Sequence, residues 1–388
     1  MWRHIASNFL TFLVVIVFLV GGVILWGQNE YNSVGPLEEP ICLQVPRGSS
    51  MRGISRELET QGAVTNSAVF RMGADYSDKT RQLKAGSWLI PEGSSMGDIA
   101  DIITRGGAST CGTEVVYRIG VNSAQVQVRE LDPTTDRFVE KAAFNPLGDE
   151  AKPALFAEVR QKADTRYRLA IAEGVTSWQI VNALNAVDAL EGTVEDMPPE
   201  GSLAPDSYEF SAGDERASVI ARMREAQDAI LAAAWKSRDD GIPLDDPYQA
   251  LILASIIEKE TGIAGERGQV ASVFTNRLRQ GMRLQTDPTV IYGITNGEGV
   301  LGRGLRQSEL RRETPFNTYV IDGLPPTPIA NPGRASIEAA VQPLDTDFIF
   351  FVAKTLDPSD GHVFAETLDE HNRNVAAYRA LEAARDNQ

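Results

Sequence analysis

The hydrophobic pattern of this chain begins with one long apolar run. No charged residue occurs over residues 5–29, and residues 9–26 are almost wholly apolar, reading FLTFLVVIVFLVGGVILW. At 1.5 Å per residue, about 20 helical residues cross the roughly 30 Å hydrocarbon core of a bilayer. The alternative is a cleaved signal peptide, but the run is long and the following GQNEYNSVGP has no small-x-small cleavage site. The pattern predicts a transmembrane helix over residues 9–28.

The charges that flank this run predict its orientation. Arg3 precedes the span, and Glu30, Glu38 and Glu39 follow it. Because basic flanks stay in the cytoplasm, residues 1–8 are expected to be a cytoplasmic tail and the remainder to lie outside.

An internal repeat follows the apolar run. Residues 45–62 read VPRGSSMRGISRELETQG, and residues 90–107 read IPEGSSMGDIADIITRGG. A fainter third copy occupies residues 171–192, IAEGVTSWQIVNALNAVDALEG. Each copy predicts a short strand, a glycine turn, a Ser or Thr cap and an amphipathic helix. The copies resemble the strand–turn–helix of LysM-type glycan-binding modules, which makes residues 29–107 a LysM-like domain; the alternative is a generic βα unit that only packs.

The next region, residues 108–168, lacks the repeat. Its segments EVVYRIGV and AQVQVREL alternate as strands do, and NPLGDEAKP is typical of a loop. We interpret the region as a strand-rich insertion with no visible chemistry.

From residue 169 onward the pattern becomes helical. Apolar positions predict helices over 217–238, from Pro247 to about Gly262 with Asp246 as N-cap, and up to Gly281. An apolar strand at 348–353, a second strand, HVFA, and a helix from about residue 367 close the chain. The fold class expected is α+β, with a mainly helical catalytic domain (169–388) that ends in a β-hairpin and a helix.

Composition narrows the possible partners. The net charge is −16 and no basic block compensates it, which argues against nucleic acid. Three histidines and two cysteines do not form a recognisable metal-binding pattern, so neither a metal nor a cofactor is expected. Cys42 and Cys111 both lie in the exported part, where a disulfide between them is favoured over two unrelated buried thiols.

Several catalytic motifs are missing from the sequence. It contains no G-x-S-x-G elbow, S-x-x-K motif, P-loop or Cys–His pairing, which leaves little support for serine, cysteine or phosphate chemistry. Carboxylates, amides, hydroxyls and tyrosines remain. Such a set suits acetal cleavage, in which a protonated carboxyl delivers a proton to the leaving oxygen.

The stretch ASIIEKETG, residues 254–262, offers candidates for that acid. On a helix, Glu258 faces small residues and Glu260 faces a bulkier apolar stripe, while Lys259 points about 100° from either neighbour. A carboxyl on an apolar wall has a raised pKa, which would keep the catalytic proton on Glu258. The alternative places Glu258 exposed in the last turn and pairs Glu260 with an arginine.

Two polar segments further along are candidates for binding the substrate. MRLQTDPTVIYG supplies Gln285, Thr286, Asp287 and Tyr292, and the Pro/Gly-rich loop at 313–333 supplies Asn317 and Tyr319. They are proposed to contact N-acetyl and hydroxyl groups of a sugar or to orient Glu258. Loop packing is the equal alternative, in which Asp287, before Pro288, is a simple turn former. Glu260, Glu266 and Arg283 are further candidates for orienting the acid.

The motifs LASIIEKET, ASVFTNRL, MRLQTDPTVIYG, TPFNTY, GLPP and HVFAETLDEHN occur in this order. In this they resemble the endolytic murein transglycosylases of the MltG/YceG family, over nearly the whole chain except about 108–168. The resemblance implies cleavage of the β-1,4 bond between MurNAc and GlcNAc in nascent peptidoglycan without water, which leaves 1,6-anhydroMurNAc ends and limits strand growth. It also implies a single-pass protein of the bacterial inner membrane, with its catalytic part in the periplasm beside the cell-wall synthases.

The resemblance assigns the catalytic acid to Glu258, the first glutamate of IIEKE. One carboxyl suffices, because the sugar's own C6 hydroxyl is the nucleophile. Phe316 departs from the family, which often carries Tyr there. A hydrolytic muramidase, with Asp287 positioning the water, and a non-catalytic peptidoglycan-binding scaffold remain as alternatives.

Overall fold

The computed structural model describes residues 2–107, 110–149, 151–162 and 165–386. Helices and strands mix throughout, as expected for an α+β chain. The chain divides into two compact units. Unit 1 comprises residues 1–115, 127–143 and 151–166, and unit 2 comprises 116–126, 144–150 and 167–388.

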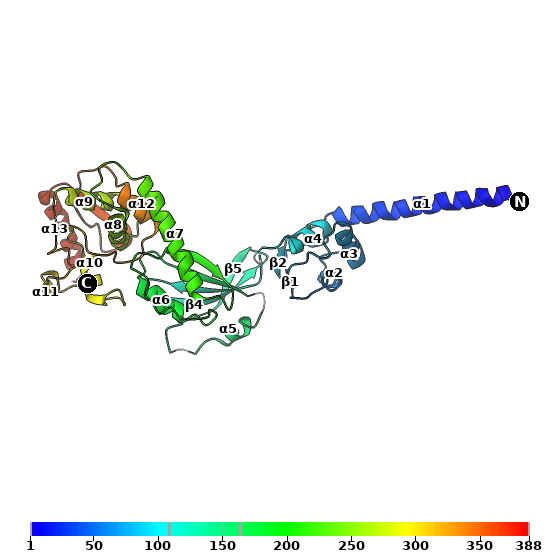
Figure 1. Cartoon of the computed structure of the whole chain (residues 1–388), viewed down its shortest axis with the longest axis horizontal. Helices are drawn as coiled ribbons and strands as arrows, with labels where there is room; N and C mark the ends of the chain where they lie inside the picture. Colours follow the sequence, from blue (N-terminus) through cyan, green and yellow to red (C-terminus); the bar gives the residue numbers. More distant parts are fainter. Residues whose placement is uncertain (1, 108–109, 150, 163–164, 387–388) are drawn as a thin grey trace. The chain divides into compact units, whose positions relative to one another are not determined.

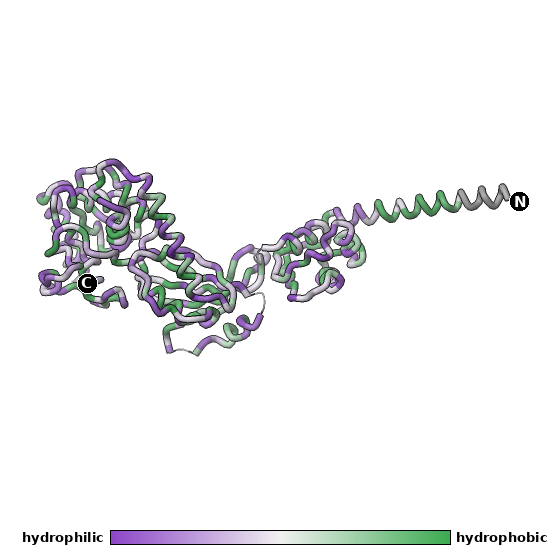
Figure 2. The backbone as a smooth tube through the Cα atoms, in the orientation of Figure 1, coloured by the Kyte–Doolittle hydropathy of each residue, from purple (hydrophilic) through white to green (hydrophobic). Residues whose placement is uncertain are grey.

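Helix α1 (Trp2–Asn32) contains the apolar run. Its segment Thr11–Asn32 is long and apolar enough to cross a membrane by length and composition. Figure 2 shows this segment as mainly hydrophobic, with hydrophilic residues at its C-terminal end. Large apolar side chains such as Phe18 and Leu25 are exposed there, which a soluble surface does not favour.

The small domain that follows α1 has the order β1 (Ile41–Val45), α2 (Met51–Thr60), α3 (Ser67–Tyr76), β2 (Gly86–Ile90) and α4 (Met96–Arg105). Strands β1 and β2 pair antiparallel, with Ile41 opposite Ile90. The helices bury apolar residues against this pair, including Leu58, Phe70 and Ile99. This core belongs entirely to unit 1.

The local structure of the repeat is confirmed in all three copies. Ser50, Ser95 and Thr176 are the N-caps of α2, α4 and α6 (Ser177–Asn185). The capping box at Thr176 includes Gln179, as its spacing predicts. The turn glycine of the third copy, Gly174, has a φ of +78°, a conformation that favours glycine.

Cys42 of β1 is joined to Cys111 by a disulfide with a Cα–Cα distance of 5.8 Å. The bond closes a loop of 69 residues around the small domain. Both cysteines belong to unit 1.

A five-stranded sheet has the order β5-β4-β3-β6-β7. Its strands are β3 (Thr113–Ile119), β4 (Ala124–Asp132), β5 (Arg137–Phe144), β6 (Arg166–Ile171) and β7 (Ser207–Phe210), and a short helix α5 (Ala154–Val159) precedes β6. Strands β3 and β4 match the expected segments, whereas β5 was missed because its charged residues hide the apolar alternation. The domain boundary expected after residue 168 falls inside β6, so residues 108–168 share this sheet with the residues that follow.

Unit 2 contains the helical core (Figure 1). Helices α7 (Arg216–Lys236), α8 (Pro247–Glu260), α9 (Arg267–Arg279) and α12 (Arg334–Val341) pack around α8. The shorter helices are α10 (Asp287–Thr295) and α11 (Gln307–Leu310), and single 3-10 turns occur at Ala264–Glu266 and Pro358–Asp360. The hairpin of β8 (Phe350–Ala353) and β9 (His362–Ala365) and the final helix α13 (Leu368–Asp386) match the expected C-terminal elements.

Two expectations about helix ends are wrong. Helix α8 ends at Glu260 rather than at Gly262, because Thr261 takes an extended conformation. Asp287 does not form a simple turn but opens α10, with Pro288 in its first turn. Proline is well tolerated there, since the first turn has no internal partner for its missing N–H.

Candidate active site

Glu258 lies near the C-terminal end of α8, an apolar helix that is buried in the core. Asp246 caps its start by accepting from the N–H of Gln249 at 2.8 Å. Every residue from Ala250 to Ile257 is buried, which fixes the helix in the core. The side chain of Glu258 is only 5% exposed, so the alternative of a solvent-exposed Glu258 is wrong.

Three groups surround the Glu258 carboxylate. The backbone N–H of Gly333 donates to its Oε2 at 3.0 Å. Arg267 Nη2 lies 3.8 Å from its Oε1, and the same nitrogen lies 3.3 Å from Oε2 of Glu173. One guanidinium therefore lies between two carboxylates.

Glu173 is a neighbour that sequence reasoning missed. Its carboxylate occupies the space that a Cβ on Gly333 would need, so a side chain at position 333 would displace Glu173. Burial raises the pKa of Glu173, the negative charge of Glu258 raises it further, and Arg267 opposes both effects. The negative charge of Glu173 offsets the positive charge that Arg267 presents to Glu258.

Lys259 approaches the same glycine as Glu258, because a Cβ on Gly174 would lie 3.6 Å from its Cδ. Its Nζ donates to the carbonyl of Gly174 at 3.3 Å. A Cβ on Gly174 would lie 3.6 Å from Cγ of Glu258, so Glu258 does face a small residue. Burial lowers the pKa of Lys259, while Glu258 and Glu200 favour its charged form.

Glu200 is a second carboxyl that sequence reasoning missed. Its Oε1 accepts from the N–H of Ser177 at 2.8 Å and from Asn331 Nδ2 at 3.3 Å, and its Oε2 accepts from the hydroxyl of Tyr292 at 3.1 Å. Burial raises its pKa, and these hydrogen bonds counteract the rise. Tyr292 thus holds another carboxyl near Lys259. No local pattern around Glu200 signals this, because its partners come from distant segments.

Glu260 has a different hydrogen-bond partner from the arginine of the alternative interpretation. Its carboxylate accepts a hydrogen bond from the hydroxyl of Thr286, which is itself buried. Burial raises the pKa of Glu260, and the Thr286 hydrogen bond opposes the rise. Thr286 therefore serves Glu260, the carboxyl that faces the core.

The other predicted residues of the 283–287 segment lie near the surface. Asp287 Oδ1 accepts from the hydroxyl of Tyr319 at 2.6 Å, and this bond adds to the effect of burial in raising the pKa of Tyr319. Gln285 is exposed with a φ of +52°. Arg283 forms an ion pair with Asp322 at 2.9 Å.

Asn317 is fully buried and all of its polar atoms are used within its own loop. Its Nδ2 donates to the carbonyls of Glu309, Leu310 and Arg312, and its Oδ1 accepts from the N–H of Tyr319. This arrangement favours the loop-packing alternative over contact with a sugar. Phe316, next to it, packs its ring 5.0 Å from that of Tyr292.

Glu266 connects the start of α9 to the hairpin. Its Oε1 accepts from the N–H of His362 at 2.7 Å, and its Oε2 lies 2.9 Å from His362 Nδ1. Burial acts to raise the pKa of Glu266, but these hydrogen bonds outweigh it and the net shift is downward. Glu266 thus fixes the turn that precedes Arg267.

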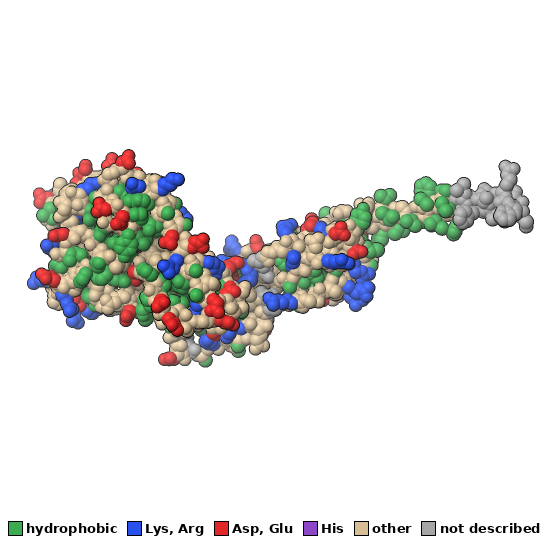
Figure 3. Space-filling model, in the orientation of Figure 1, with side chains coloured by type: hydrophobic (Ala, Val, Ile, Leu, Met, Phe, Trp, Pro, Cys, Tyr) green, Lys and Arg blue, Asp and Glu red, His purple; other side chains and the backbone are tan. Residues whose placement is uncertain are grey.

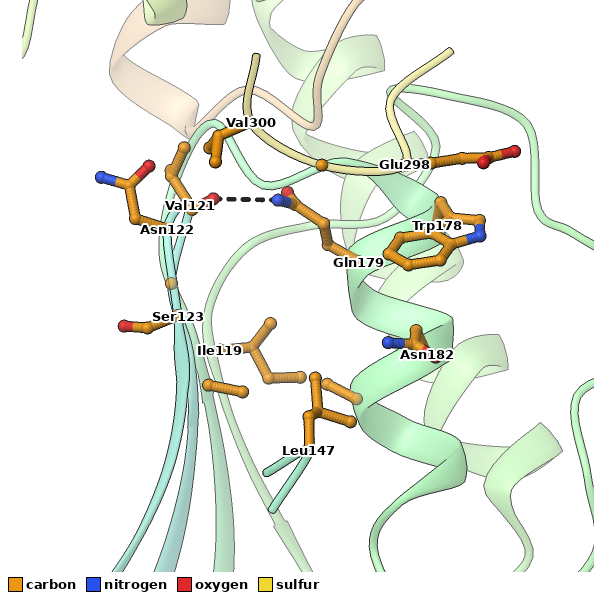
Figure 4. A pocket seen from close by; sticks show the side chains of 14 residues that line it. Ile119, Val121, Asn122, Ser123, Leu147, Trp178, Gln179, Asn182, Glu298 and Val300 are labelled. Atoms are coloured by element: carbon orange, nitrogen blue, oxygen red, sulfur yellow. Dashed lines mark hydrogen bonds between the residues drawn. The ribbon is translucent and has the colours of Figure 1, made fainter. Parts of the chain in front are cut away.

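Two cavities that share lining residues lie beside this cluster. The first, about 300 Å³, is lined by Lys259, Tyr292 and Thr176 among others. The second, about 190 Å³, is lined by Trp178 and Asn182 of α6, by the β3–β4 turn and by residues 298–300 (Figure 4). In Figure 4, Gln179 Nε2 donates to the carbonyl of Val121 at 2.9 Å, and this bond ties α6 to the turn. Trp178 is a candidate that sequence reasoning did not consider.

These features define a class of site: a buried carboxyl with an arginine and a second carboxyl, beside a cleft lined by apolar and amide side chains. Comparison with known proteins gives the family. The YceG-like family model matches residues 43–146 and 147–377, and the chain belongs to this family. The match includes residues 108–168, which the motif resemblance had left out.

Named relatives cover most of the chain. An endolytic murein transglycosylase of Bacillus subtilis is 28% identical over 93% of this chain and 91% of its own length. The endolytic murein transglycosylase of Streptococcus pneumoniae D39 is 25% identical over 97% of this chain and 66% of its own length. A crystal structure of a YceG-like protein from Listeria monocytogenes is 27% identical, with a TM-score of 0.45, and covers 86% of this chain and 99% of its own.

Proposed function

We propose that this chain is an endolytic peptidoglycan lytic transglycosylase, a lyase with Glu258 as its catalytic acid. The observation that carries the proposal is the placement of Glu258. A nearly buried carboxyl ends an apolar helix and is oriented by the N–H of Gly333 between Arg267 and the core. Relatives named endolytic murein transglycosylase, matched over most of the chain, support the same activity.

In the proposed reaction, Glu258 gives its proton to the glycosidic oxygen O4, which bridges MurNAc C1 and GlcNAc C4, and the C1–O4 bond breaks. The resulting carboxylate then accepts the proton of the C6 hydroxyl while O6 bonds to C1. The product is a 1,6-anhydroMurNAc end, and Glu258 is protonated again. Water is not consumed, because the nucleophile belongs to the substrate.

The glycan strand is proposed to lie along the two cavities beside Lys259. Trp178 offers an apolar face of the kind that sugar-binding clefts use, and Asn182 and Gln179 offer amide groups. Of the residues expected to bind the sugar, Tyr292 lines the first of these cavities. Gln285, Asp287 and Tyr319 lie on neighbouring segments and stay candidates for more distant sugar units, whereas Thr286 bonds to Glu260 and Asn317 is occupied within the fold.

The location proposed is the bacterial inner membrane. Helix α1 would span the bilayer once, with the catalytic unit in the periplasm near cell-wall synthases. The disulfide between Cys42 and Cys111 supports an oxidising compartment. The small domain remains a candidate LysM-like glycan-binding module, supported by its repeated strand–turn–helix units.

The test is product analysis by mass spectrometry after incubation of the full chain with purified uncrosslinked glycan strands. Internal fragments with 1,6-anhydro ends are expected. Reducing ends would instead indicate a hydrolytic muramidase, and unchanged strands would indicate a non-catalytic scaffold.

A further inference from the structure

The end of helix α1 is built into the small domain. The ring of Tyr31 lies against Gly73 of α3, where a Cβ would overlap it, and Tyr31 packs on the apolar core of the domain. Thr65 donates a hydrogen bond to Glu30, and the N–H of Gly35 donates to the carbonyl of Gly93 at 3.1 Å. Helix α1 and the small domain therefore form one body rather than two parts joined by a linker.

An apolar cavity of about 560 Å³ lies between α1 and α3. Helix α1 contributes Val23 and Ile24, and helix α3 contributes Met72 and Tyr76. Met72 is 61% exposed and Tyr76 is 87% exposed, and their spacing of four residues places both on one face of α3. Figure 3 shows apolar side chains continuing along α1 as far as the small domain.

The depth of this face follows from counting residues along α1. Residues 5–29 carry no charge, and Tyr31 already packs on the core of the small domain. We therefore place the crossing of about 20 residues four positions nearer the N-terminus than the predicted span of 9–28, so that it begins at Ile5 and ends at Ile24. Glu30 lies six residues further, or about 9 Å along the helix axis. The polar layer on each side of the hydrocarbon is roughly 5–8 Å thick, so Glu30 reaches its outer edge while Ile24 stays at its inner edge.

We propose that this face of α3 docks into the outer leaflet of the membrane, with lipid acyl chains filling the α1–α3 cavity. Met72 and Tyr76 lie beside Val23 and Ile24, hence at the boundary between headgroups and acyl chains. Tyrosine is favoured at this depth, and the flexible side chain of methionine adapts to a disordered apolar surface. The inference rests on the proposed membrane anchor and adds that the small domain is held on the bilayer surface.

The experiment uses the full chain in nanodiscs whose phospholipids carry bromine on the upper acyl chain, which quenches nearby tryptophan. Tyr76→Trp is placed in a background of Trp2→Phe and Trp26→Phe, and the emission of this background without the added tryptophan, which comes from Trp88, Trp178 and Trp235, is subtracted. Glu57→Trp in the same background is the matched control, since Glu57 is exposed on α2 and does not line the cavity. The otherwise unchanged protein, with Trp26 in place, reports on the anchor itself.

The tryptophan added at position 76 is expected to lose about half of its emission, as a side chain 5–10 Å into the interface would, while the one at position 57 is unaffected. Equal emission from the two variants, with Trp26 still quenched, would overturn the docking surface and leave the anchor intact. An unquenched Trp26 would overturn the anchor. Shielding of position 76 from both the lipid quencher and aqueous acrylamide would indicate a protein on this face and would also overturn the proposal.

Discussion

The backbone N–H of Gly333 donates a hydrogen bond of 3.0 Å to Glu258, 75 residues earlier in the chain. Gly333 has no side chain, and the carboxylate of Glu173 fills the space beside its Cα. A single glycine thereby orients one carboxyl and admits a second, and Arg267 contacts both. The negative charge of Glu173 therefore offsets part of the positive charge that Arg267 presents to Glu258.

Glu173→Gln is expected to shift the pH dependence of the cleavage rate. The pKa of Glu173 is raised, so its negative charge forms only as the pH rises above the ordinary range of a carboxyl. Once formed, that charge helps a neighbouring carboxyl to keep its proton. Without it, the descending limb of activity moves to lower pH, while activity at the acidic end is largely retained.

The measurement is the initial rate of strand cleavage from pH 4 to 9, with Glu225→Gln as the matched control on the exposed surface of α7. If the descending limb of the pH–rate curve lies at the same pH in Glu173→Gln as in the parent, Glu173 has no influence on the catalytic acid.

Glu260→Gln is expected to raise the free energy of unfolding at neutral pH. Burial raises the pKa of Glu260 above its ordinary value of 4.5, so the folded state binds the proton more tightly than the unfolded state does. Stability from this residue is present below pH 4.5 and is lost as the pH rises through the raised pKa. Gln carries no charge and still accepts from Thr286. Urea unfolding at pH 4 and pH 7 should show a gain only at pH 7, and a gain at neither pH would contradict the buried placement.

Asn317→Ala is expected to destabilise the fold. The substitution removes the partner of three loop carbonyls and of the Tyr319 N–H, all in a fully buried position. Leaving buried polar groups unpaired costs about 1–3 kcal/mol each, although some would recover water. A lower melting temperature with unchanged KM for the remaining folded enzyme supports loop packing. Unchanged stability with a raised KM would instead favour direct contact with the sugar.

Removal of the disulfide is expected to destabilise unit 1. A bond that closes a loop of 69 residues restricts the unfolded chain, which corresponds to about 4 kcal/mol in the chain-entropy model. The double variant Cys42→Ser and Cys111→Ser should become sensitive to proteolysis between residues 42 and 111. Equal protease resistance of variant and parent would show that the small core is sufficient by itself.

The features that local sequence determines were the ones that sequence reasoning predicted. Ser50, Ser95 and Thr176 cap helices because a hydroxyl, a preceding glycine turn and a following apolar period are all nearby in the chain. Glu258 was singled out in the same way, because helical spacing places it on a face of small residues. Its assignment as the acid came from the family motif.

Contacts between distant segments could not be predicted. Glu173 and Glu200 lie in separate loops, and only the fold brings them to Arg267, Lys259 and Tyr292. A simple turn was the alternative considered for the Asp–Pro pair at 287–288, since this pair is common both in turns and in the first turn of a helix. Strand β5 was missed because four of its eight side chains are exposed, and three of these are charged, which weakens the apolar signal.

The most direct test of the central claim is Glu258→Gln, assayed by mass spectrometry on purified glycan strands. Gln has nearly the same shape and can still accept the Gly333 N–H, so folding is expected to be preserved and is checked by the melting temperature. The account predicts a properly folded variant that forms no 1,6-anhydro ends. Persistence of these ends at the parent rate would contradict the assignment of Glu258 as the catalytic acid.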